Sequence, residues 1–279
     1  MFFLILTIIT GSMVALVIRA SQGRVKGRFS MMAANYLTAL LAALMWMGPA
    51  NVIPRGAGAG LALGMGAVNG IFYAGGIWLM QRNVEKNGVV LPSAFSRLGA
   101  LLVPLALAVT VFGEVPRTTQ LLGVIIAVGA ILSINYDKNQ VRVTSRALLL
   151  CLMLSDGCAA AMSKIFKEVG EGGQTDRFVF CTFCFAFLIS VGLLLKHGER
   201  PGPTEVGFGI LLGLPNFLAT RFLLMALERV PAFLAYPVRG VGGILFVTLA
   251  GVLLFGERLK RRQWVSLGAI CAALVLLNL

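Results

Sequence analysis

Four charged side chains lie inside apolar stretches that are long enough to cross a lipid bilayer: Arg97, Asp156, Arg221 and Arg239. A charge at the centre of the hydrocarbon costs at least about 2.5–3.5 kcal/mol on insertion scales, so each residue is a candidate for a binding site. The planar guanidinium of arginine can hold a carboxylate or phosphate through two parallel hydrogen bonds. Three arginines against one acid therefore favour a ligand that carries negative charge.

Arg221 and Arg239 are expected at similar depths, because each lies about 10 Å along its helix from the turn at Arg229 at about 1.5 Å per residue. Like charges at one level of a low-dielectric region repel each other unless an anion lies near them. We therefore expect both arginines to hold the anionic group of a solute. Arg97 is expected about 8 Å inside from the opposite membrane face, and it is a further candidate for the same task.

Asp156 is the one carboxylate near the middle of an apolar stretch. It is a candidate to hold an amine, to exchange a proton, or to neutralise an arginine when the site is empty. An internal ion pair with one arginine and no ligand is an equally good interpretation of the same residue types.

Two asparagines and several aromatic residues complete the candidate site. Asn69 and Asn216 are both expected near mid-depth, where their amides can bind a solute or join two helices. The aromatic candidates for the wall of an amphipathic cavity also suit core packing, and they are Phe72, Tyr73, Trp78, Phe217 and Tyr236.

The composition requires a membrane to position these residues. Of 279 residues, 58% are hydrophobic and 13% are charged, whereas soluble domains carry roughly a quarter charged residues. The excess of 24 Lys and Arg over 11 Asp and Glu is explained by basic cytoplasmic loops rather than by nucleic acid. Neither Cys181-x-x-Cys184 nor the single His197 has the partners of a metal site, so no metal is expected.

The apolar stretches predict an all-α polytopic membrane protein with ten transmembrane helices, since about 20 apolar residues cross the hydrocarbon. The expected helices are Phe2–Ile18, Ser30–Gly48, Ala59–Met80, Pro92–Phe112, Gln120–Tyr136, Ala147–Phe166, Phe178–Leu195, Val206–Leu227, Ala232–Phe255 and Trp264–Leu277.

A short motif divides the chain into two halves. Phe112-Gly113-Glu114 recurs 143 residues later as Phe255-Gly256-Glu257, and Gln120 and Gln263 share that spacing. Asn69 and Asn216 match at a spacing of 147. We predict two five-helix repeats, residues 1–139 and 140–279, that together form one transport domain. Because five is odd, the second repeat enters the membrane inverted.

The ends of the helices set the topology. Most lysines and arginines lie in loops after odd-numbered helices, which places those loops in the cytoplasm and both termini outside. Glu114 and Glu257 are expected to have structural roles in turns, with Arg117 or Arg258 as partners. Lys164 is expected to extend to the membrane interface.

The ten short helices, the inverted repeat and the glycine–glutamate pairs resemble the drug/metabolite transporter superfamily, and within it the EamA-like exporters. The resemblance covers essentially the whole chain, and its loose motifs identify a family better than a substrate. It implies secondary transport of small organic solutes through a central cavity, without a bound cofactor. Small multidrug exporters of the superfamily use a glutamate in the first helix, but residues 2–18 contain no acid.

We therefore predict a secondary active transporter, an exporter of a small anionic or zwitterionic metabolite such as an amino acid or organic acid, working by alternating access. The alternatives are a flippase or transporter for a phosphorylated or lipid-linked substrate, and a multidrug exporter. An enzyme is not expected, because no acid–base set lies at one depth. The expected setting is the inner or plasma membrane, as a monomer or homodimer, with protons as a candidate coupling ion and the lipid bilayer as solvent.

Overall fold

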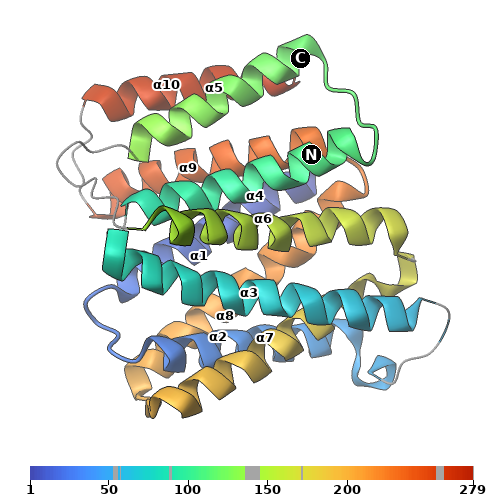
Figure 1. Cartoon of the computed structure of the whole chain (residues 1–279), viewed down its shortest axis with the longest axis vertical. Helices are drawn as coiled ribbons and strands as arrows, with labels where there is room; N and C mark the ends of the chain where they lie inside the picture. The colour runs from blue at the N-terminus through green and yellow to red at the C-terminus, as the bar shows by residue number, and fades with distance from the viewer. Residues whose placement is uncertain are drawn as a thin grey trace. The chain divides into compact units, whose positions relative to one another are not determined.

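The computed structural model describes residues 1–52, 56, 58–87, 90–135, 145–170, 172–255 and 261–278. Within these residues all of the regular secondary structure is helical (Figure 1). The ten α-helices are α1 Phe2–Ser21, α2 Arg28–Met47, α3 Ala59–Asn87, α4 Val90–Thr110, α5 Thr118–Asn135, α6 Arg146–Val169, α7 Thr175–His197, α8 Pro203–Leu227, α9 Ala232–Phe255 and α10 Arg261–Asn278. Two short 3-10 helices are η1 Pro49–Asn51 and η2 Gly172–Gln174.

Every predicted helix is present, and the prediction of an all-α polytopic membrane protein is confirmed. Among the described residues, eight helices have the length and apolarity of membrane spans, while α5 and α10 contain shorter apolar segments. The second copy of the glycine–glutamate motif, Gly256-Glu257-Arg258, lies outside the described residues. The inversion of the two repeats stays a prediction.

The largest difference from prediction is the end of α3, which continues to Asn87 rather than ending at Met80. Two asparagine side chains hold this polar extension. The amide of Asn83 donates to the carbonyl oxygens of Leu79 and Leu148 at 2.9 and 2.8 Å. Asn87 accepts a hydrogen bond from the backbone N–H of Ser145 at 3.0 Å, just before α6 begins. The polar turns of α3 are thus fixed by hydrogen bonds instead of by hydrophobic burial.

The helices form two compact units, each of which takes residues from both predicted halves of the sequence. The α5–α10 unit comprises Met1, Gly75–Lys164 and Leu227–Leu279, and the α2–α7 unit comprises Phe2–Ala74 and Ile165–Ala226. The boundaries fall inside α3 and α6 and at the end of α8. A compact unit and a sequence repeat are therefore different divisions of this chain.

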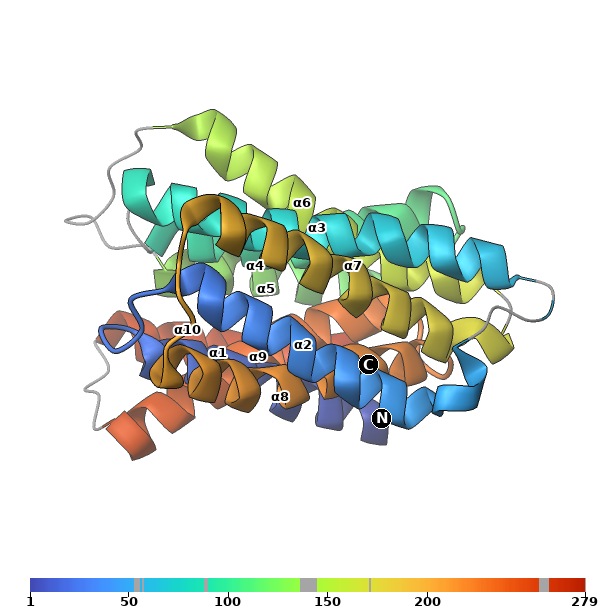
Figure 2. The same ribbon diagram turned by 90° about the horizontal axis from the view of Figure 1, so that it is seen from below.

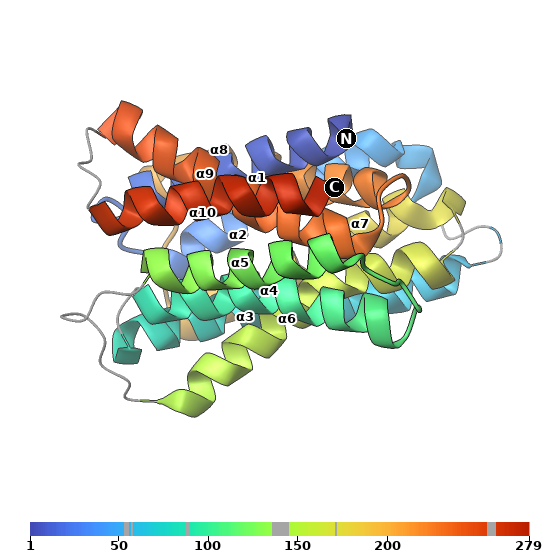
Figure 3. The same ribbon diagram turned by 90° about the horizontal axis from the view of Figure 1, so that it is seen from above.

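In the α5–α10 unit, α5 lies along α10 and α4 along α9 (Figure 3). Their shared core consists of Leu98, Leu101, Ala127, Ala130, Ile131, Val241, Ile244, Ile270 and Ala273. Glycines bring the backbones together, because a side chain at Gly99 would overlap the carbonyl oxygen of Met153 on α6. Small residues permit this close helix packing where hydrophobic burial provides no driving force.

In the α2–α7 unit, α2 lies along α7 (Figure 2). Gly66 and Gly70 of α3 lie directly against the α7 backbone, and Gly213 of α8 lies against Asn35 of α2. A Cβ at Gly66 would come within 2.9 Å of the carbonyl oxygen of Phe178. These contacts bring polar residues of α2, α3, α7 and α8 within hydrogen-bonding distance of one another.

Candidate functional site

The eleven predicted site residues divide between the two units. The α2–α7 unit holds Asn69, Phe72, Tyr73, Asn216, Phe217 and Arg221, and the α5–α10 unit holds Trp78, Arg97, Asp156, Tyr236 and Arg239. Each set is described within its own unit.

Arg221 of the α2–α7 unit forms an ion pair with Asp176. Its Nη2 lies 2.9 Å from Oδ1 of Asp176, in the first turn of α7, and the two side chains are 13% and 36% exposed. The guanidinium carbon lies 5.8 Å from the ring centre of Trp46. On α8, Arg221 is about 9 Å from the last residue, Leu227, at about 1.5 Å per residue.

The hydrogen-bonding capacity of Arg221 is largely unused. Its Nε and Nη1 atoms are buried and have no hydrogen-bond partner among the described residues, and the same holds for Oδ1 of Asp176. Asp176 is close enough to neutralise the arginine, but its oxygen is not aligned to accept a hydrogen bond. A buried donor without an acceptor costs about 1–3 kcal/mol, so this site favours a ligand with acceptor oxygens.

A row of polar side chains leads along α8 toward Arg221. The amide of Asn216 donates to Oδ1 of Asn35 on α2 at 3.3 Å. One turn later, the hydroxyl groups of Thr220 and Tyr73 are 3.1 Å apart. Thr220 also donates to the carbonyl oxygen of Asn216 at 3.1 Å. Helical spacing of four residues explains why these side chains share one face.

Aromatic rings lie beside this row. Phe217 is buried and contacts Trp46 and Phe183 edge-on, with ring centres 6.1 and 6.4 Å apart. Tyr73 meets Phe183 in a T-shaped contact at 6.0 Å. Phe217 and Arg221 are one helical turn apart and both contact Trp46, so the aromatic and cationic groups are continuous.

Asn69 is fully buried against α7. Its amide donates to the hydroxyl of Thr182 at 3.2 Å, while its Oδ1 has no hydrogen-bond partner among the described residues. One of the two roles expected of this residue, joining helices, is therefore observed.

In the α5–α10 unit, Asp156 of α6 lies in a space that a glycine provides. It accepts a side-chain hydrogen bond from Ser96 of α4. A Cβ at Gly76 of α3 would overlap its Oδ1 atom. Within the described part of the chain, Asp156 forms no ion pair with an arginine. Its carboxylate is thus held by a hydroxyl and has capacity for a further partner.

The two candidate arginines of this unit lie on neighbouring helices, Arg97 on α4 and Arg239 on α9. Both are half-buried, and neither forms an ion pair with a described residue. The interior Pro237 of α9 lies two residues before Arg239, and Pro215 of α8 precedes Arg221 by six. Each proline lacks an N–H and so removes one backbone hydrogen bond of its helix.

The aromatic candidates of this unit are placed differently. Tyr236 is buried and donates to the carbonyl oxygen of Ala160 at 2.8 Å, which joins α9 to α6. Trp78 is 37% exposed, and the guanidinium of Arg82 lies 5.8 Å from its ring centre. Core packing fits Tyr236, whereas Trp78 lies at the surface of α3.

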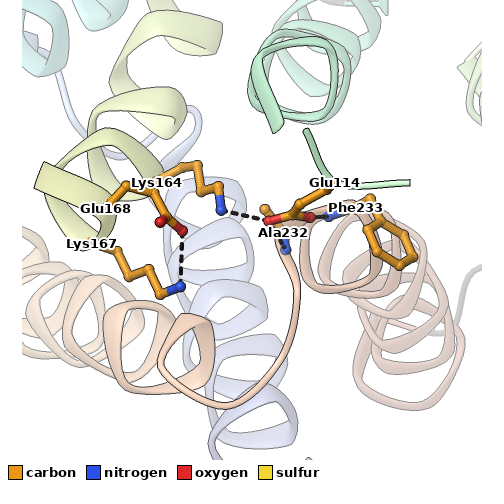
Figure 4. A network of polar contacts seen from close by, with 6 residues as sticks. All are labelled: Glu114, Lys164, Lys167, Glu168, Ala232 and Phe233. Atoms are coloured by element: carbon orange, nitrogen blue, oxygen red, sulfur yellow. Dashed lines mark hydrogen bonds and ion pairs between the residues drawn. The ribbon is translucent and has the colours of Figure 1, made fainter. Parts of the chain in front are cut away.

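Glu114 joins the loop after α4 to two helices (Figure 4). Its Oε1 lies 2.5 Å from Nζ of Lys164, and its two oxygens accept the backbone N–H groups of Ala232 and Phe233 at 3.3 and 3.1 Å. These N–H groups open α9, where no earlier turn can pair them. The structural role expected for Glu114 is observed, but its ionic partner is Lys164 rather than Arg117.

The expectation that Lys164 extends to the membrane interface is wrong. Its side chain is 3% exposed, and its Nζ lies 5.0 Å from the ring centre of Phe112. Burial is tolerated because the glutamate neutralises the ammonium. No group of three or more His, Cys, Asp or Glu residues in the described ranges is arranged to bind a metal ion.

Comparison with known proteins identifies the class of this fold. Residues 146–279, which include α6 to α10, match the EamA-like transporter family. This segment is similar to the EamA-like transporter family. The family is part of the drug/metabolite transporter superfamily, so the predicted resemblance is confirmed, and three of the four charged residues within apolar stretches lie in the EamA-like segment.

Two further comparisons extend beyond that segment. An uncharacterized protein of Haemophilus influenzae is 26% identical over 195 residues, which is 68% of this chain and 66% of the relative, just under two thirds of its length. A crystal structure with 14% sequence identity matches with a TM-score of 0.75 over 99% of this chain and 94% of its own. That likeness shows that this chain and the crystal structure share a fold along nearly their whole lengths.

Two contacts of the candidate site residues were not predicted from the sequence. Asp176 was placed before the helix rather than in its first turn, so it was not considered as a partner of Arg221. Asn35 lies in an apolar stretch of helix 2, and its isolated amide is a signal that could have indicated a polar contact between helices.

Proposed function

We propose that this protein is a secondary active transporter, an exporter of a small anionic or zwitterionic metabolite such as an amino acid or organic acid, working by alternating access. Similarity of residues 146–279 to the EamA-like family supports the transporter class. The observation that carries the substrate class is the buried Arg221 guanidinium, whose Nε and Nη1 have no hydrogen-bond partner in the described part of the chain and whose Nη2 lies 2.9 Å from a carboxylate oxygen.

The chemistry of the site favours a carboxylate. A ligand oxygen would supply the acceptors that Arg221 lacks, and charge-assisted hydrogen bonds are about twice as strong as neutral ones. Phe217 and Trp46 provide an apolar surface next to the cation. Asp176 offers an oxygen to an ammonium group. An amino acid presents all three complementary features, a carboxylate, an ammonium and an apolar side chain.

The remaining predicted residues have secondary roles in this proposal. Arg239 and Arg97 are further candidates for the anionic group, and Asp156 is a candidate proton site, because each carries a charge without an ionic partner in the described residues. Protons would then drive export across the cell membrane. Direction can be measured by comparing uptake in inverted and right-side-out vesicles.

A ligand panel on the purified protein in mild detergent tests the substrate class. Amino acids, dicarboxylates, sugar phosphates and aromatic cations are compared by thermal unfolding, since a ligand at 100 times its Kd adds about 2.7 kcal/mol to the folded state. We expect carboxylates to stabilise the wild type but neither Arg221→Gln nor Arg239→Ala. Arg200→Gln, at an exposed position, is the control and should respond like the wild type.

The panel also separates the alternatives. Stabilisation by sugar phosphates alone would replace the proposal with a transporter of phosphorylated substrates. Stabilisation by aromatic cations alone would refute the anion site and favour a multidrug exporter that binds through an acid.

A further inference from the structure

Asp176 is an anion built into the site at the position that a substrate carboxylate must reach. Its Oδ1 lies 2.9 Å from Nη2 of Arg221, and its side chain is 36% exposed against 13% for the arginine. The acid is therefore the more accessible member of the pair. A carboxylate that binds Arg221 must either displace Asp176 or share the guanidinium with it.

The contact between the two groups is suited to displacement. Among the residues that the structure describes, Oδ1 of Asp176 has no hydrogen-bond donor, and Nε and Nη1 of Arg221 have no acceptor. The pair thus has ionic attraction without the hydrogen bonds that make arginine–carboxylate pairs strong. Asp176 is the second residue of α7, and the unpaired N–H groups at a helix start stabilise a carboxylate that has left its partner.

Among the described residues, the two cationic residues nearest to Asp176 in the sequence have other partners. Arg177 donates through Nη1 to the side chain of Gln174 and through Nη2 to the carbonyl oxygen of Asn51 at 2.9 Å. Lys167 pairs with Glu168 at 2.8 Å. Neither of these cations replaces Arg221 as the group that Asp176 neutralises, so a change of partner at Arg221 leaves Asp176 as a free acceptor.

We infer that Asp176 determines specificity: a substrate carboxylate displaces it from Arg221, and the released Asp176 then binds the substrate ammonium. This inference rests on the proposed function. A zwitterion replaces the internal pair with two new pairs and keeps the site neutral. A simple carboxylate leaves Asp176 unpaired beside a second negative charge, and a dianion increases that repulsion. The site therefore selects amino acids over the organic acids of the same shape.

The test uses matched ligands that differ only by the α-ammonium group. The Kd values of L-leucine and 4-methylpentanoate, and of L-aspartate and succinate, are measured for the full chain in detergent. We expect the wild type to prefer each amino acid. In Asp176→Asn, the Kd of the organic acid divided by the Kd of the amino acid should fall at least tenfold in each pair, because binding of the organic acid improves and binding of the amino acid weakens.

Two variants act as controls. Glu168→Gln removes a nearby carboxylate that is paired with Lys167 and should leave both ratios unchanged. Asp176→Ser, which keeps a residue suited to a helix start, gives the same measurement if the asparagine variant does not fold. Unchanged ratios in both Asp176 variants, with binding retained, would overturn the inference and leave the proposed function intact. No binding of any of the four ligands to the wild type would refute both.

Discussion

Glu114→Gln should lower the free energy of unfolding by about 3 kcal/mol, although the two side chains have nearly the same shape. Different oxygens of Glu114 accept the N–H groups of Ala232 and Phe233, and the single amide oxygen of glutamine can still accept one of them, so the start of α9 loses one hydrogen bond. Lys164, at 3% exposure, loses the charge that neutralises it. Removing one partner of a buried ion pair costs about 3–5 kcal/mol, and the 16% exposure of Glu114 places the cost at the lower end.

The same reasoning predicts rescue by a second substitution. Lys164→Met removes the charge that Glu114 neutralised and retains an unbranched side chain against Phe112. The double variant Glu114→Gln/Lys164→Met should lie within about 1 kcal/mol of the wild type, because apolar replacement of a buried pair is often neutral. Stability is measured by reversible unfolding of the purified protein in mild detergent with increasing fractions of a denaturing detergent.

The neighbouring pair Lys167–Glu168 provides a matched control (Figure 4). Its side chains are 34% and 29% exposed, and such solvated pairs contribute only about 0–1 kcal/mol. Glu168→Gln should therefore be nearly neutral. The reasoning is refuted if Glu114→Gln is as stable as Glu168→Gln, or if the Lys164→Met substitution adds to the loss instead of restoring stability.

Two further substitutions test packing and a buried hydroxyl. Gly99→Ala should lower the free energy of unfolding by more than about 2 kcal/mol, because the added methyl would overlap a backbone carbonyl of α6. As a control, a Cβ at Gly129 meets no described atom within 4 Å, so Gly129→Ala should be neutral or stabilising by up to about 1 kcal/mol. Equal losses of stability for the two variants in the same unfolding assay would contradict the packing. Tyr236→Phe should lower the free energy of unfolding by about 0.5–1.5 kcal/mol, because it loses the hydrogen bond to Ala160, and ligands of the panel should still stabilise it. If the variant were as stable as the wild type but no longer stabilised by ligands, the hydroxyl would instead bind the substrate.

Hydropathy along the chain predicted every helix, because the apolar length of a span is a local property of the sequence. It underestimated α3, whose last turns are held by Asn83 and Asn87 through contacts with residues just before and within α6. These contacts join residues 58 and 65 positions apart. The hydropathy of a short segment does not reveal contacts with such distant residues, and the polar residues of this segment by themselves predict a loop.

The candidate site was predicted by residue type but not by partner. A charge in an apolar stretch identified Arg221 as a candidate, yet its contact with Asp176 depends on how α7 and α8 pack. Lys164 shows the same limit, because its position near a helix end favoured the interface until the fold brought Glu114 beside it. Charge and depth can be estimated from one helix, whereas pairing requires the packing of several.

The pairing of distant helices also sets an order for folding during synthesis. Thr118 and Arg261, which begin α5 and α10, are 143 residues apart, and ribosomes add about 5–20 residues per second. The synthesis of α5 therefore precedes that of α10, the helix that covers it, by about 7–30 s, and the interval between α2 and α7 is similar. Lipid must serve as the temporary partner of these faces. Helices whose closest packing uses glycine and alanine can wait in this way, since the bilayer accepts small apolar surfaces that water would drive to aggregate.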